Sequence, residues 1–139
     1  MCWIGRKNTK QVAKRDFYVY KIGLVIDDTF TSLFQKYIYR IKENNPIIFL
    51  NIVEDNCGMI KIEKGYHSYK EVAIEFYQTP YFRDIYLGDA INGFIDNLSL
   101  YSHLYLGTFI VPKGSEYYIN RRGEIVSSNI IYTGKCVKL

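Results

Sequence analysis

The chain has few of the residues from which metal sites and disulfide frameworks are built. It contains three cysteines and two histidines in 139 residues. Cys2, Cys57 and Cys136 are odd in number and widely spaced, and neither they nor the histidines show the short spacings of a zinc site. We therefore expect no structural metal, no cofactor and no disulfide, and a reducing, cytoplasmic location.

Long hydrophobic runs are also missing. No apolar stretch approaches the roughly 20 residues that a membrane-spanning helix needs. The basic stretch at residues 1–16 lacks the apolar core of a secretory signal peptide, and no glycine-rich turn leads from a strand into a helix as in a phosphate loop. These absences predict a single domain over residues 1–139 that is neither exported nor embedded in a membrane.

Tyrosine is the residue type in excess. The chain contains 14 Tyr, 8 Phe and 1 Trp, so aromatic residues make up 17% of it. Tyrosine suits half-exposed sheet faces and binding surfaces, but an AT-rich gene would explain the excess equally well.

The charged residues are segregated along the chain: residues 1–45 and 113–139 carry local charges of +5 and +3, and residues 46–112 carry −4. A basic side and an acidic side would steer ligands and partners.

The clearest strand pattern lies near the C-terminus. Pro112-Lys113-Gly114 and Asn120-Arg121-Arg122-Gly123 have the composition of type I turns and separate three runs of strand formers. We interpret these runs as an antiparallel meander with its register set by the two turns, formed by Tyr105–Val111, Glu116–Asn120 and Glu124–Tyr132.

Earlier parts of the chain predict further strands. Phe17–Ile26 is rich in β-branched and aromatic residues, with Gly23 as a possible bulge, Ile47–Val53 is typical of a buried strand, and Met59–Glu63 returns from it. Residues 30–43 are ambiguous, because the alternation of Tyr37 and Tyr39 fits a strand whereas the apolar spacing favours an amphipathic helix.

Two short helices are predicted as well. Ser68 and Glu71 have the spacing of a capping box, which indicates a helix at Tyr69–Gln78. Asp89 is placed to cap a second helix over residues 89–98. The predicted fold class is therefore α+β: a mainly antiparallel, twisted sheet with a C-terminal β-meander and one to three short helices.

His67 is the most informative single residue. The run Tyr66-His67-Ser68-Tyr69 places a titratable ring where a strand is expected to meet a helix, and the free N–H groups of a helix start favour an anion. The alternative is a histidine that only caps the helix. No carboxylate can be placed beside it, so the sequence supplies no acid–base pair and favours a protein that is not an enzyme.

Two other features allow alternative interpretations. Removal of Met1 would expose Cys2 as an N-terminal nucleophile, but Trp3 stands where such openings have glycine, and we favour packing of both residues in a terminal strand. The N-terminal basic residues and the pair Arg121-Arg122 would contact phosphates, with tyrosines for stacking. Because no recognition helix or RNA-binding signature accompanies them, a solvated basic face is favoured and nucleic acid is disfavoured as a partner.

The chain resembles two kinds of protein. The segments MCWIG, VYKIG, GYHSY and IVPKGSEYYINRRGEIVS are similar to short proteins of gut-anaerobe bacteria and their phages, a group with no settled activity. The order Tyr20-Lys21, His67-Ser68 and a strand into Pro112-Lys113-Gly114-Ser115 resembles ADP-ribosyltransferase domains. Those enzymes have a catalytic glutamate where this chain has Leu106-Gly107-Thr108. That resemblance implies a nucleotide-shaped cleft without the catalytic carboxylate.

We therefore predict a non-enzymatic binding module of phage or mobile-element origin. It would hold a small anionic, nucleotide-like ligand or a host protein, which would suit the sequestering of a host signal molecule in counter-defence. The predicted ligand-binding residues are Tyr20, Lys21, Tyr66, His67, Ser68, Tyr69, Arg121 and Arg122. The alternatives are a divergent ADP-ribosyltransferase-like enzyme, with Tyr20, His67 and Ser68 around the nicotinamide, and a self-assembling interaction protein that forms homo-oligomers.

Overall fold

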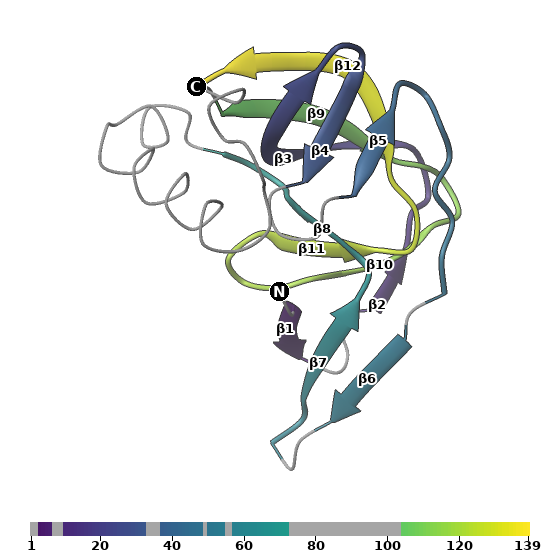
Figure 1. The fold of residues 1–139 in the computed structure, drawn as a ribbon. Coiled ribbons are helices and arrows are strands. Elements are labelled where there is room, and N and C mark those ends of the chain that lie inside the picture. Colours follow the sequence, from purple (N-terminus) through teal and green to yellow (C-terminus); the bar gives the residue numbers. More distant parts are fainter. Residues whose placement is uncertain (1–2, 7–9, 33–36, 49, 55–56, 73–103) are drawn as a thin grey trace.

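The computed structural model describes residues 3–6, 10–32, 37–48, 50–54, 57–72 and 104–139, and every regular element in these ranges is a β-strand (Figure 1). The strands are β1 (Trp3–Arg6), β2 (Lys10–Val12), β3 (Phe17–Ile26), β4 (Thr29–Ser32), β5 (Ile38–Arg40), β6 (Leu50–Glu54), β7 (Met59–Lys64), β8 (Tyr66–Tyr69), β9 (Tyr105–Val111), β10 (Glu116–Ile119), β11 (Glu124–Ser127) and β12 (Ile131–Lys138). The predicted α+β class is wrong, because the described residues form an all-β structure. A helix with the length and hydrophobicity to cross a membrane does not occur among them.

The strands form two antiparallel sheets. The larger sheet has nine strands, and its main path is β12-β9-β3-β8-β11-β10-β2. It is extended where β4 pairs with β3 and β5 pairs with β4. The smaller sheet has the order β1-β7-β6 and forms the lower part of Figure 1. A parallel bridge between Ile41 and Tyr132 joins the end of β5 to β12, so that β3, β4, β5, β12 and β9 surround one core.

The main core is centred on Phe30. Its ring centroid lies 5.1 Å from that of Phe109 and 5.4 Å from that of Tyr132, and all three side chains are buried. Phe30 also lies against two glycines on neighbouring strands: a Cβ atom added to Gly23 would be 2.5 Å from its ring, and one added to Gly107 would be 2.6 Å away. Gly23 therefore allows close packing and is not the predicted bulge, since the β3–β9 register runs without a shift from Phe17 to Gly23 and the β3–β4 register starts at Gly23.

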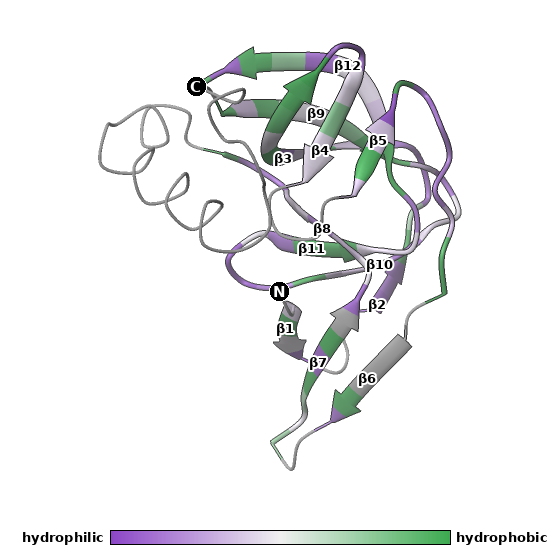
Figure 2. Cartoon of the chain, viewed as in Figure 1, coloured by the Kyte–Doolittle hydropathy of each residue, from purple (hydrophilic) through white to green (hydrophobic). Residues whose placement is uncertain are grey.

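A second core joins the two sheets. Trp3, Ile60 and Ile62 from the smaller sheet pack against Tyr118 and Val126 from the larger one. The indole nitrogen of Trp3 donates a hydrogen bond of 2.9 Å to the carbonyl oxygen of Glu124, the first residue of β11. The predicted packing of Trp3 in a terminal strand is confirmed, whereas Cys2 lies outside the described residues. Figure 2 shows hydrophobic residues at several positions of β3, β7 and β11, which contribute to these cores.

Residues 30–43 contain strands, so the favoured helix is wrong and its alternative holds at the residues described here. In the β4–β5 pairing Phe30 lies opposite Tyr39, and both side chains are buried. Backbone pairing with β3 outweighs the helical spacing of apolar residues, which is a weak preference in a chain of aromatic and β-branched residues. The predicted buried strand Ile47–Val53 is displaced as well: β6 begins at Leu50, and Ile48 is 81% exposed.

The C-terminal meander is only partly correct. Both turns occur, and the second one joins β10 to β11 with Tyr118 opposite Val126. However, β9 pairs with β3 and β12, so the first turn carries the chain to another part of the sheet and makes no hairpin. The single run Glu124–Tyr132 is also divided, because β11 ends at Ser127 and β12 begins at Ile131.

The predicted helix at Tyr69–Gln78 fails where the structure describes it. Ser68 does not cap a helix, because it lies inside β8 and pairs with Ile125 of β11. A capping box is a local pattern, and two neighbouring strands supply more backbone hydrogen bonds than one helix start. Residues 73–78, and the whole of the second predicted helix at 89–98, lie outside the described residues.

The close packing of Phe30 on Gly107 predicts a double-mutant coupling. Gly107→Ala should lower the free energy of unfolding by about 1–3 kcal/mol, because its Cβ would overlap the Phe30 ring. In a Phe30→Leu background the same change should cost less, giving a coupling energy of at least about 0.5 kcal/mol by urea denaturation. Strictly additive costs would contradict the proposed overlap.

Candidate functional site

The candidate site is built around β8, which lies between β3 and β11. Tyr20 of β3 is the register partner of Tyr69, and β8 pairs with β11 along its whole length. Because side chains alternate across a strand, β8 presents two different faces. Tyr66 and Ser68 point to the main core, which we call the core face. His67 and Tyr69 point to the opposite side, which we call the second face.

Lys21 is the charged residue of the core face. It follows Tyr20 on β3, so its side chain shares a face with Ser68. Its ammonium group donates a hydrogen bond to the carbonyl oxygen of His67 and lies 5.5 Å from the ring centroid of Tyr39. Burial lowers the pKa of Lys21 from 10.5 to about 8, because the charged form loses its hydration. The site therefore holds a buried cation whose described contacts are a carbonyl group and an aromatic ring.

Tyr39, the ring beside this cation, belongs to a group of three tyrosines. Tyr37, Tyr39 and Tyr66 pack against one another, with ring centroids between 4.7 and 6.0 Å apart. The Tyr66 hydroxyl donates to the Tyr37 hydroxyl at 3.4 Å, and the Tyr37 hydroxyl donates to Oδ1 of Asn45 at 3.0 Å. Burial raises the pKa of Tyr39 and of Tyr66, so both remain neutral. Sequence reasoning did not select Tyr37 and Tyr39, although their alternation in residues 30–43 was the available signal.

Several buried polar atoms near β8 have no hydrogen-bond partner among the residues described. They are the hydroxyl oxygens of Ser68 and Ser127 and Nε2 of His67. Ser127 is opposite Tyr66 in the β8–β11 register, so both serines lie on the core face. A buried polar group without a partner costs about 1–3 kcal/mol. These atoms are groups that a ligand or an ordered water would satisfy, and Ser127 was missed because nothing in its local sequence marks it.

The second face carries His67, Tyr69 and Tyr20. His67 is opposite Val126, which belongs to the core between the sheets, and is partly covered there. Burial and the nearby charge of Lys21 lower its pKa from 6.5 to about 4. His67 is therefore a neutral imidazole at pH 7, and the helix start beside which the sequence placed it does not form, because His67 lies inside β8.

Arg121 and Arg122 lie in the turn that follows β10, next to the end of β8. Oδ1 of Asn120 accepts hydrogen bonds of 3.0 Å from the backbone nitrogens of Arg122 and Glu124 and so holds the turn in shape. The backbone nitrogen of Lys70 donates a bond of 2.9 Å to the carbonyl oxygen of Gly123. Both arginines and Lys70 are exposed, and none of the three is in an ion pair with a described residue. We call Lys70, Arg121 and Arg122 the basic turn cluster.

The structure thus brings the predicted site residues together in two groups. Lys21, Tyr66 and Ser68 lie on the core face, whereas Tyr20, His67 and Tyr69 lie on the second face, and the turn of Arg121 and Arg122 is joined to the end of β8. Cation, hydroxyl and aromatic groups of this kind bind anions and planar rings. Within the described ranges no three His, Cys, Asp or Glu side chains are grouped as a metal ion would need.

No family model, curated protein or solved structure matches this chain. The resemblances to phage and gut-anaerobe proteins and to ADP-ribosyltransferase domains therefore stay predictions.

The pKa of Lys21 predicts a rise of stability in alkali. Between pH 8 and 10.5 the folded protein has lost a proton that the unfolded chain still holds, so the free energy of unfolding should increase with pH, by up to about 1.4 kcal/mol per unit. Lys21→Met should lack this increase, while Lys14→Met, at an exposed lysine, should keep it. Parallel urea titrations of the three proteins measure it, and identical slopes would refute the assignment.

The pKa of His67 predicts a separate change in acid. The folded protein resists protonation until about pH 4, whereas the unfolded chain takes up a proton near pH 6.5. Stability should therefore be complete above pH 6.5 and be lost as the pH falls towards 4. In His67→Gln this loss should be smaller by up to about 1.4 kcal/mol per pH unit, as measured by thermal unfolding across the range. A variant as acid-sensitive as the parent would show that His67 is not the group responsible.

Proposed function

We propose that the protein is a binding module for a small anionic, nucleotide-like ligand, held on the second face of β3 and β8 beside the basic turn cluster. The observation that supports this best is the register of one residue pair. Tyr20 and Tyr69 are directly opposite each other, and the residue after Tyr69 is bonded to the turn that carries Arg121 and Arg122. An aromatic surface and a group of cations are thereby placed side by side.

The chemistry of the two parts fits the two ends of a nucleotide. Tyrosine rings stack on any base, and such stacking is worth about 1–3 kcal/mol per base. Arginine binds phosphate oxygens through two parallel N–H donors. A Cβ atom added to Gly123 would be 3.8 Å from Cβ of Lys70, so the first carbon of the Lys70 side chain lies next to this turn.

The surroundings of the cluster limit its strength. Glu71 follows Lys70, and Glu124 pairs with Tyr69 across β8 and β11, so two carboxylates lie near three cations. Nδ2 of Asn120 donates a hydrogen bond of 3.4 Å to a carboxylate oxygen of Glu124, which leaves the negative charge of Glu124 in place. The cluster therefore fits one to a few phosphate groups better than it would fit a large acidic surface.

The residues of the core face have a different role in this proposal. Lys21, Tyr66 and Ser68 are buried, so a ligand bound at the surface of the sheet would not reach their side chains. The hydrogen bond from Lys21 to His67 fixes β8 against β3. The ligand contacts that we propose are therefore Tyr20, Tyr69, Arg121, Arg122 and Lys70.

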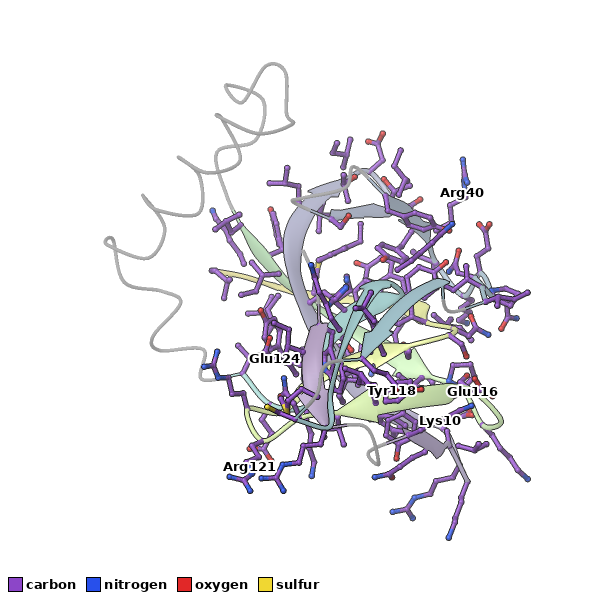
Figure 3. All side chains as sticks on the ribbon, turned by 90° about the horizontal axis from the view of Figure 1, so that it is seen from below. Lys10, Arg40, Glu116, Tyr118, Arg121 and Glu124 are labelled. Carbon is purple, nitrogen blue, oxygen red and sulfur yellow. The ribbon has the colours of Figure 1, made fainter. Side chains whose placement is uncertain are left out.

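The proposal predicts a charge-dependent affinity for nucleotides. Isothermal titration calorimetry with AMP, ATP and cyclic nucleotides should detect binding, and Arg121→Gln with Arg122→Gln should weaken it at least about tenfold, because hydrogen bonds to charged groups contribute about 1.5–3 kcal/mol each. Arg40→Gln is the matched control, since Arg40 is also an exposed arginine but lies far from Arg121 in Figure 3. Equal affinities of the Arg40 and the Arg121/Arg122 variants would contradict the site. The absence of heat with every nucleotide would favour a protein partner instead.

A further inference from the structure

We infer that the natural ligand of the second face is a single-stranded nucleic acid, of which an isolated nucleotide occupies only one position. This inference rests on the function proposed above and extends it from one base to several. The sequence disfavoured nucleic acid because no recognition motif is present. The strand register supplies what the sequence did not show: tyrosines that share one face of β3 and β8, next to the turn that carries Arg121 and Arg122.

The tyrosines on this face continue along β3. Tyr18 is two residues before Tyr20, so both side chains leave β3 on the same face, about 7 Å apart. Tyr18 is 61% exposed, although a tyrosine gains by burying its ring. Tyr18, Tyr20 and Tyr69 therefore form a set of three rings on two paired strands. Sheet surfaces with two or three such aromatic rings bind unpaired bases by stacking.

The basic turn cluster would hold the backbone of the same strand. Each phosphate neutralised on a single strand contributes a slope of about −0.7 to the dependence of log affinity on log salt. Three cations therefore predict a slope of about −2, which is small for a nucleic-acid-binding protein. Glu71 and Glu124 beside the cluster also keep the salt dependence of binding small, because they reduce the net charge of the cluster. Stacking must then supply most of the affinity, and only unpaired bases can stack in this way.

The test is a length series of labelled oligonucleotides followed by fluorescence anisotropy. Mononucleotides and strands of two, four and eight nucleotides, as RNA and as DNA, are compared with a duplex of the same sequence. We expect the affinity to rise at least about tenfold from one nucleotide to four and then to level off, because three rings accept three bases. The duplex should bind at least about tenfold more weakly, and the salt slope should be near −2. A difference in affinity between RNA and DNA identifies the preferred type of nucleic acid. A preference for either type agrees with the inference.

Tyr18 supplies the matched variants. Tyr18→Ala removes an exposed ring and should weaken binding of the four-nucleotide strand at least about fivefold, the equivalent of about 1 kcal/mol. Tyr18→Phe keeps the ring and should restore the affinity. The thermal unfolding midpoint of Tyr18→Ala, compared with those of Tyr18→Phe and the parent, shows whether a loss of binding comes from a structural defect.

The outcomes separate this inference from the proposed function. Equal affinity for one and eight nucleotides, with the arginine dependence intact, overturns the strand and leaves the small-ligand site in place. Equal binding of duplex and single strand, unaffected by Tyr18→Ala, identifies a non-specific basic surface and also overturns the inference. Failure of every length to bind overturns both.

Discussion

One residue pair connects the two halves of the larger sheet. On one side of it lie β12, β9 and β3 with β4 and β5, and on the other lie β8, β11, β10 and β2. Tyr20 opposite Tyr69 is the register contact between β3 and β8, and the Lys21 ammonium bonded to the His67 carbonyl crosses the same boundary. Beyond this point the partner of β3 changes, because Gly23–Ile26 pair with β4. Lys21 is buried at this change of partner.

This boundary also explains why the candidate site has two unlike faces. The core face is closed by aromatic rings, and its polar atoms are Lys21 and the serines. The second face is partly covered by the smaller sheet at His67 and is more open at Tyr18. A buried cation and buried hydroxyl groups without a hydrogen-bond partner both lower the stability of the fold. The ring of Tyr18 and the basic turn cluster are exposed, so the proposed binding site on that side would need no rearrangement of the core.

The sequence predicted individual strands well and their partners poorly. Phe17–Ile26 and Tyr105–Val111 are strands with the expected bounds, because β-branched and aromatic residues favour an extended chain locally. The turn at Asn120–Gly123 was also predictable, since its asparagine and glycine act within four residues. The hairpin expected between β9 and β10 does not form, because β9 finds β3 and β12 as partners. The helix suggested by Ser68 and Glu71 does not form for a similar reason. The capping pattern is local, whereas the pairing of β8 with β11 involves residues more than 50 positions away.

By itself, therefore, the sequence determined several of the extended segments and the positions of the two tight turns near the C-terminus. These properties depend on neighbouring residues and need no knowledge of the fold. The tertiary structure alone decided that Tyr20 faces Tyr69, that Lys21 is buried beneath Tyr39, and that Arg121 and Arg122 adjoin the end of β8. Each of these contacts joins residues far apart in the chain. Their formation depends on which strands pair and on how the aromatic core packs around Phe30, and no local pattern contains that information.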